Sequence, residues 1–212
     1  MQQGPAYGIL GGTFDPPHVG HLALAQEVCA RLSLARVWFI PTGQPPHKPG
    51  RTISSGADRR AMVELAIAGN PRFGISIVEL KRQGPSYTVE TLRLLRDEWG
   101  PDARLVLILG WDMLAYLPQW RDPAGVVAGA DQIAAVHRPG VPAPEGEVAR
   151  LAAAVPGLAA KLRVLAGPEL DISSTELRER VAADLPIRYL APDSVCEYIA
   201  LRGLYRNGTP GS

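Results

Sequence analysis

The feature that most constrains this 212-residue chain is an apolar run that stops at two glycines and restarts as a helix. Residues 7–10 predict a buried strand, and Gly11 and Gly12 allow a tight turn and the close approach of a ligand to the backbone. The prolines at 16 and 17 suit the first turn of a helix that runs to about Leu32. A strand that enters a helix through a glycine turn predicts an α/β protein with an anion site at this corner.

Two histidines stand at the start of that helix. His18 and His21 are three residues apart, which places both rings on one helix face, and Gly20 leaves room for a phosphate against the backbone. The pair alone is equally compatible with a helix cap, a core position or the start of a zinc site. A zinc site is short of ligands, because the remaining histidines and cysteines are scattered, namely His47, His137, Cys29 and Cys196.

Composition limits the class of protein. The net charge is +1, so no global charge indicates nucleic acid, a membrane surface or an acidic partner. No Lys or Arg precedes Arg31, and no apolar run approaches a membrane span, which argues against a signal peptide or anchor. Two cysteines without a local pattern indicate free thiols, so we expect a cytoplasmic protein.

Hydrophobic patterns alternate between strands and helices along the whole chain. Strands are predicted at residues 36–41, 72–80, 104–110, 132–137 and 163–166, and helices at 57–68, 86–99, 122–130, 145–154, 173 onward and 189–203. This alternation predicts βαβ units and therefore a mostly parallel sheet with helices on both faces. The length fits one domain, residues 1–212, whose C-terminal helical part (about 173–205) packs on the part that contains the sheet.

Three further segments carry polar residues where strands end or helices begin. The proline-rich loop 42–50 holds His47 and Lys48; it has the composition of an exposed linker, but it leaves the same sheet edge as the glycine corner. Thr88 opens a helix, where a cap is the simplest explanation. Ser173 with Glu176 forms a capping box.

The strand at residues 104–110 is the most apolar in the chain and should be central. After Gly110, Asp112 emerges at its carboxyl end, where a carboxylate can accept hydrogen bonds from ribose hydroxyls. Trp120 fits either the core or a stacking surface for a planar ring. Ser174 and Arg178 lie one turn apart at another helix start, where free N–H groups favour anions.

Five strings together resemble a known family. They are Gly-Gly-Thr-Phe-Asp-Pro with His-x-Gly-His at 11–21, Pro-Pro-His-Lys at 45–48, Tyr-Thr-x-x-Thr-Leu at 87–92, Gly-x-Asp to Trp at 110–120, and Ile-Ser-Ser-Thr-x-Leu-Arg at 172–178. The first and last are similar to phosphate motifs of the nucleotidyltransferase superfamily. The set resembles the bacterial nicotinate mononucleotide adenylyltransferases.

This resemblance implies a Rossmann-like, doubly wound α/β fold and the transfer of AMP from ATP to nicotinate mononucleotide, giving nicotinate adenine dinucleotide and pyrophosphate in NAD synthesis. Mg²⁺ would accompany ATP, held mainly by substrate phosphates rather than by protein ligands. The implied catalytic residues are His18, His21, Lys48 and Arg178. The implied ATP-binding residues are Gly11, Gly12, Thr13, Phe14, Gly20, Gly110, Asp112, Ser173 and Ser174, and the implied acceptor-binding residues are His47, Thr88, Trp120 and Arg121.

Position 121 departs from the family, which often has an aromatic residue after the tryptophan where this chain has Arg121. A guanidinium beside a carboxylated ring would be electrostatically sensible. Two alternatives remain: another small-acceptor enzyme, such as phosphopantetheine adenylyltransferase or a cytidylyltransferase, and a non-catalytic nucleotide-binding regulator. The sequence also leaves open a homo-oligomer and the preference for the acid or the amide mononucleotide.

Overall fold

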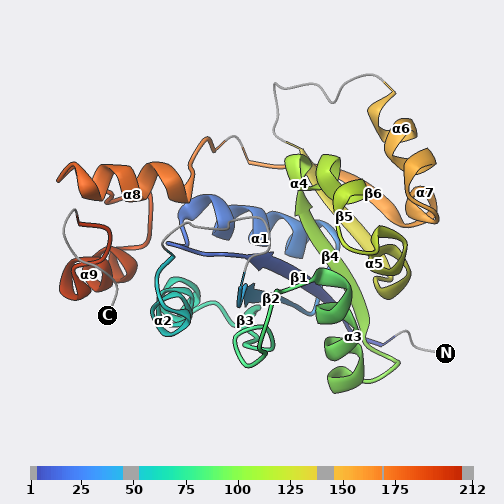
Figure 1. The fold of residues 1–212 in the computed structure, drawn as a ribbon, viewed down its shortest axis with the longest axis horizontal. Helices are drawn as coiled ribbons and strands as arrows, with labels where there is room; N and C mark the ends of the chain where they lie inside the picture. Colours follow the sequence, from blue (N-terminus) through green and yellow to red (C-terminus); the bar gives the residue numbers. More distant parts are fainter. Residues whose placement is uncertain (1–3, 45–52, 138–145, 169, 207–212) are drawn as a thin grey trace.

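The computed structural model describes residues 4–44, 53–137, 146–168 and 170–206. Its centre is a six-stranded sheet in which every neighbouring pair is parallel, in the order β3-β2-β1-β4-β5-β6 (Figure 1). The strands are β1 (Ala6–Gly12), β2 (Arg36–Pro41), β3 (Phe73–Ile75), β4 (Arg104–Gly110), β5 (Gln132–His137) and β6 (Leu162–Ala166). The predicted α/β sheet is confirmed, and β1 and β4 lie at its centre.

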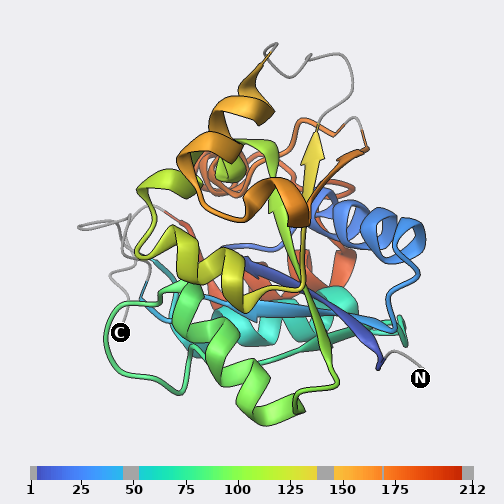
Figure 2. The same cartoon turned by 90° about the vertical axis from the view of Figure 1, so that its right-hand side faces the viewer.

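Helices cover both faces of the sheet, as predicted for a doubly wound fold. They are α1 (Val19–Arg31), α2 (Gly56–Ile67), α3 (Thr88–Trp99), α4 (Trp111–Tyr116), α5 (Pro123–Gly129), α6 (Glu147–Ala154), α7 (Leu158–Lys161), α8 (Ser174–Ala182) and α9 (Asp193–Arg202), with a 3-10 turn at Leu117–Gln119. One apolar cluster joins the sheet to α1 and α2, and another joins it to α3 through α7. Figure 2 shows α1 (blue) and α3 (green) on opposite sides of the strands.

The C-terminal helices α8 and α9 pack on α2 rather than directly on the sheet. A third apolar cluster joins Met62 of α2 to Leu177 of α8 and to Val195 and Ile199 of α9. In Figure 1 these helices (orange and red) extend from the α1 and α2 side of the molecule. This packing carries the start of α8 toward the carboxyl end of β1.

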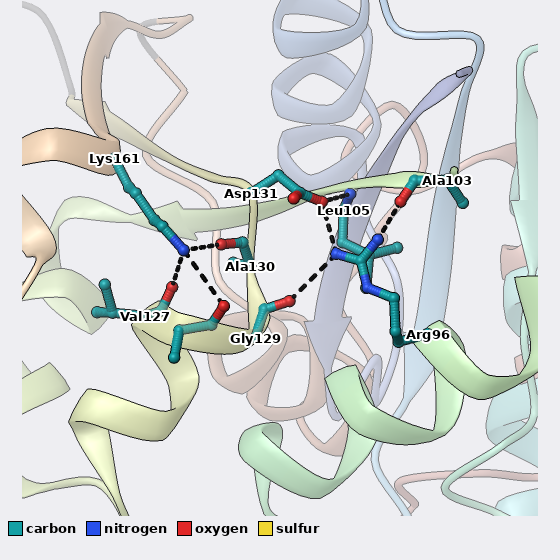
Figure 3. A network of polar contacts seen from close by, with 9 residues as sticks. Arg96, Ala103, Leu105, Val127, Gly129, Ala130, Asp131 and Lys161 are labelled. Carbon is teal, nitrogen blue, oxygen red and sulfur yellow. Dashed lines mark hydrogen bonds and ion pairs between the residues drawn. The ribbon is translucent and has the colours of Figure 1, made fainter. Parts of the chain in front are cut away.

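A polar network closes the opposite edge of the sheet, where β4 and β5 begin (Figure 3). The Asp131 carboxylate accepts a hydrogen bond from the backbone N–H of Leu105 at 2.7 Å and pairs with Arg96 at 2.6 Å. Lys161 donates from Nζ to three carbonyls in residues 127–130, between 2.7 and 3.2 Å. The bonds from Lys161 satisfy carbonyls at the end of α5, which have no partner within the helix.

Two local predictions are wrong. The strand expected over residues 72–80 ends at Ile75. Its partner β2 reaches Pro41 soon afterwards, and proline has no N–H to continue the ladder of hydrogen bonds. The chain instead turns and buries Glu79. The first helix begins at Val19 rather than at the prolines, because His18 is its N-cap residue. The short helices α4 and α7 were not predicted.

Candidate active site

The glycine corner lies at the carboxyl end of β1, beside the carboxyl end of β4. A side chain at Gly11 would project into open space, whereas one at Gly12 would lie 3.0 Å from the Phe14 ring. Phe14 has a φ of 51° and is almost fully buried, with its ring 5.6 Å from that of Phe39. A left-handed backbone at a phenylalanine is strained, and burial of the ring offsets that strain. The corner is therefore rigid.

The two histidines form a stacked pair at the start of α1. Their ring centroids are 3.7 Å apart and their planes differ by 31°. The backbone N–H of His18 donates to Nδ1 of His21 at 3.3 Å, so the proton of a neutral His21 is on Nε2. His18 is 6% exposed, and its Nδ1 makes no hydrogen bond within the described residues. A side chain at Gly20 would lie 3.0 Å from that nitrogen, which explains why glycine separates the histidines.

Burial keeps both rings neutral at pH 7. It lowers the pKa of His18 to about 4 from the ordinary 6.5. The pKa of His21 falls to about 3, through burial first and then through the neighbouring His18. A buried, unpartnered nitrogen is costly unless a ligand satisfies it. An anion at this corner would also favour the charged rings and raise both pKa values.

The N-terminus of α8 contacts the same corner. Ser174 donates from its hydroxyl to the carbonyl of Pro16 at 2.8 Å, and Arg178 donates to the carbonyl of Asp15 at 2.7 Å. Ser173 is the N-cap residue and accepts a hydrogen bond from the N–H of Glu176 at 3.1 Å, as the capping alternative predicted. The starts of α1 and α8 thus meet at one point, and the positive dipole ends of both helices lie there. The N–H of Val19 at the start of α1 already donates to the carbonyl of Leu190 at 3.0 Å.

The carboxyl end of β4 supplies a polar residue next to the corner. Gly110 is the N-cap residue of α4, and Asp112 is exposed in the first turn of that helix. Because β1 and β4 are neighbours and the chain leaves them toward opposite faces, a ligand can bind between their ends. Thr13, in the loop between β1 and α1, is half-buried.

A second group of predicted residues gathers at the start of α3. Thr88 is the first residue of that helix, after the N-cap residue Tyr87. The guanidinium of Arg121 lies over the Tyr87 ring at 4.6 Å from its centroid. Trp120, the preceding residue, is partly buried against the apolar cluster on this face. The segment after α4 and the start of α3 therefore form one surface.

His47 and Lys48 lie outside the described residues, so the structure does not place them. Sequence reasoning missed two buried charged residues at the site, Asp15 and Arg59, which are 3% and 2% exposed. Asp15 stood inside the motif without a role. Arg59 gave no signal, because an arginine on a helix is typical of a solvated face.

Within the described residues no group of three metal-ligating side chains occurs. In the same part of the chain, no helix is both long enough and apolar enough to cross a bilayer.

Comparison with known proteins places this chain in a family. A family model described as Cytidylyltransferase-like matches residues 9–180. A probable nicotinate-nucleotide adenylyltransferase of Roseiflexus sp. (strain RS-1) is 49% identical over 199 residues, which are 94% of this chain and 97% of that protein. A protein of the same description from Dehalococcoides mccartyi (strain ATCC BAA-2266 / KCTC 15142 / 195) is 46% identical over 198 residues, covering 93% and 96%.

Solved structures agree on the fold. Nicotinic acid mononucleotide adenylyltransferase of Plasmodium falciparum, complexed with NaAD, superposes with a TM-score of 0.75 at 18% identity, covering 95% of this chain and 97% of that one. The same enzyme complexed with APC gives a TM-score of 0.74. The predicted Rossmann-like fold and the predicted family are confirmed.

Proposed function

This chain belongs to the Cytidylyltransferase-like family, among relatives described as nicotinate-nucleotide adenylyltransferases, and on that premise we propose how its residues transfer AMP from ATP to nicotinate mononucleotide. The products are nicotinate adenine dinucleotide and pyrophosphate. One observation carries the assignment of the site: a buried histidine, one of whose nitrogens has no hydrogen-bond partner among the described residues, is stacked on a second histidine where the N-termini of α1 and α8 meet.

The reaction needs no side-chain nucleophile. An oxygen of the acceptor's 5′-phosphate attacks the α-phosphorus of ATP in line, and the bond from that phosphorus to the pyrophosphate oxygen breaks. Catalysis then consists of positioning and of stabilising the charge that develops on the oxygens. The corner suits this task, because its donors are fixed before the ligand arrives.

In this proposal each histidine binds a different part of the triphosphate. His18 donates to the α-phosphate region and stabilises the transition state, and His21 donates from Nε2 to the outer phosphates. Support comes from the bond that occupies Nδ1 of His21 and leaves Nε2 as its donor. Both rings gain a proton more readily once the phosphates are in place, which strengthens these bonds.

The pyrophosphate side is proposed to involve Lys48 and Arg178, with the N–H groups of Ser173 and Ser174. Arg178 donates a hydrogen bond from Nη1 to the carbonyl of Asp15 and another from Nη2 to the hydroxyl of Thr175 at 3.1 Å. It is therefore held at the corner while its charge remains available to a phosphate. The backbone of residues 11–14 and Gly20 would contact the nucleotide, and Asp112 with Gly110 its ribose.

The acceptor is proposed to bind between the start of α3 and the segment after α4. Trp120 would stack on the pyridine ring, and Thr88 and His47 would contact the nucleotide. Arg121 is held over the Tyr87 ring, beside the N-terminus of a twelve-residue helix. A carboxylate on the ring would meet a guanidinium and a positive helix end, which favours the acid over the amide.

We also propose that Mg²⁺ accompanies ATP. Such an ion usually keeps several waters and is held mainly by substrate phosphates rather than by a dedicated set of protein ligands. When bound, the ion would neutralise charge on the outer phosphates. A cytoplasmic location and a homo-oligomer stay predictions.

A pyrophosphate-release assay tests the function. The purified protein is given ATP with nicotinate mononucleotide, with nicotinamide mononucleotide, with phosphopantetheine, or with no acceptor, and CTP replaces ATP in a parallel series. We expect release with ATP and the acid mononucleotide, at the highest kcat/KM of the set. Preferred use of phosphopantetheine or CTP would establish the alternative enzyme, and no release with any acceptor would favour the regulator.

The matched variant Arg121→Gln keeps hydrogen-bonding capacity but removes the charge. It should lower the kcat/KM ratio of acid to amide by roughly tenfold, the effect of losing one charge-assisted bond. An unchanged ratio would remove Arg121 from the acceptor site without affecting the assignment of the reaction.

A further inference from the structure

One arginine outside the predicted site joins the separate segments that build it. Arg59 lies in the first turn of α2, and its side chain runs toward the loop between β1 and α1. Its Nη1 donates to the carbonyl of Thr13 at 3.0 Å and to that of Thr42 at 2.7 Å. Its Nη2 donates to the carbonyl of Gly43 at 3.3 Å, and its Nε to that of Ser54 at 3.1 Å. All these acceptors are main-chain carbonyls.

The bonds of Arg59 reach the acceptor side through Gly43. The N–H of Gly43 donates to the hydroxyl of Ser86 at 3.0 Å, and the N–H of Ser86 donates to the carbonyl of Gln44 at 2.9 Å. Ser86 stands two residues before Thr88, at the start of α3. A side chain at Gly43 would lie 2.4 Å from the carbonyl oxygen of Glu79, so only glycine permits this approach. The start of α3, here called the acceptor wall, is thereby tied to the same guanidinium as the loop between β1 and α1, here called the nucleotide corner.

The surroundings of Arg59 favour this arrangement over an exposed arginine. The residue is 2% exposed, and burial lowers its pKa, while the charge of Asp15 acts in the opposite direction. Asp15 in turn accepts hydrogen bonds from the N–H of Ser54 at 3.2 Å and from the hydroxyl of Tyr205 at 2.6 Å. Ser54 is thus held through both its N–H and its carbonyl. A buried cation with several main-chain acceptors is rigid, because moving it would leave those carbonyls unpaired.

We propose that Arg59 is a positioning residue that holds the nucleotide corner and the acceptor wall in register for in-line attack. It contacts neither substrate in the proposed function, on which this inference rests. Each half of the site is built by its own strand and helix, so each substrate can bind without Arg59. Turnover needs both halves at a fixed separation, and the planar guanidinium fork bonds to segments on both sides.

The test compares Arg59→Lys and Arg59→Ala with a matched control, Arg60→Ala, which removes an exposed arginine paired with Glu64 at 2.8 Å. For each protein we measure kcat, the KM of each substrate, the dissociation constant of ATP alone, and the unfolding midpoint; activities are taken well below that midpoint. We expect both Arg59 variants to lose roughly 100-fold in kcat, the cost of a misplacement of about 1 Å, with ATP affinity close to wild type. Arg60→Ala should match wild type.

Guanidinium rescue separates positioning from mere stabilisation. Millimolar guanidinium ion, below denaturing concentrations, should restore part of the kcat of Arg59→Ala and leave Arg59→Lys unchanged. The inference is overturned if both variants keep wild-type kcat, or if their loss follows only the fraction of folded protein with no rescue. Absence of activity in the wild-type protein would instead refute the proposed function.

Discussion

The low pKa of His18 predicts a pH-dependent loss of stability that can be assigned to one side chain. The folded-state pKa is about 4, against 6.5 for an unperturbed histidine. Between these values the unfolded chain binds more protons than the folded one, so stability falls as the pH is lowered through this range and stops falling below about pH 4. At pH 7 the contribution is close to zero, and at pH 5 it amounts to about 2 kcal/mol.

Substituting His18 by Gln removes this titration and retains a polar side chain of similar size. Urea unfolding of both proteins at pH 7 and pH 5 gives four free energies of unfolding. The wild-type protein should lose about 2 kcal/mol more than His18→Gln between the two pH values. Comparing two pH values in each protein cancels the packing effect of the substitution.

Saturating ATP provides an internal check, because bound phosphates should raise the pKa of His18 and reduce the loss in the wild-type protein. Equal losses in the two proteins without ATP would refute the reasoning, since the ring would then have an ordinary pKa and could not be the desolvated group at the corner.

Two further substitutions test other parts of the structure. Trp120→Ala should chiefly raise the KM for nicotinate mononucleotide in steady-state assays, because a stacking surface is lost; an effect confined to ATP would place Trp120 elsewhere. Lys161→Met should lower the free energy of unfolding by about 2 kcal/mol in urea titrations, because three carbonyls lose a charged donor. The exposed Lys81→Met is its control, and an equal effect of both would contradict the network at the end of α5.

Strong patterns made the centre of the fold predictable. The strand at residues 104–110 is apolar on both faces, and the apolar run from residue 7 marks β1. The tight turn predicted at Gly11 and Gly12 is wrong, because β1 continues through both glycines and pairs with β2 as far as Gly12. The strand predicted over 72–80 failed because its outer half is governed by the buried Glu79, whose carboxylate accepts a bond from Thr91 at 2.7 Å. That contact joins residues of different elements, and no local pattern indicates it.

The residues of the site show the same difference between local patterns and contacts that join distant parts of the chain. Motif residues such as His18 were predictable because their neighbours in sequence are their neighbours in space. The contact between Arg121 and Tyr87 joins residues 34 positions apart. The bonds from α8 to the loop before α1 span more than 150 residues. Arg59 shows the limit most clearly, since its role depends on three segments that only the folded chain brings together.

In the proposed function, the histidine corner stabilises the transition state of adenylyl transfer. The most direct measurement is kcat for His18→Ala, with ATP and nicotinate mononucleotide saturating, alongside the dissociation constant of ATP. We expect a kcat roughly 100-fold or more below wild type, with ATP still bound. A variant that turns over at the wild-type rate, or that loses only its affinity for ATP, would contradict it.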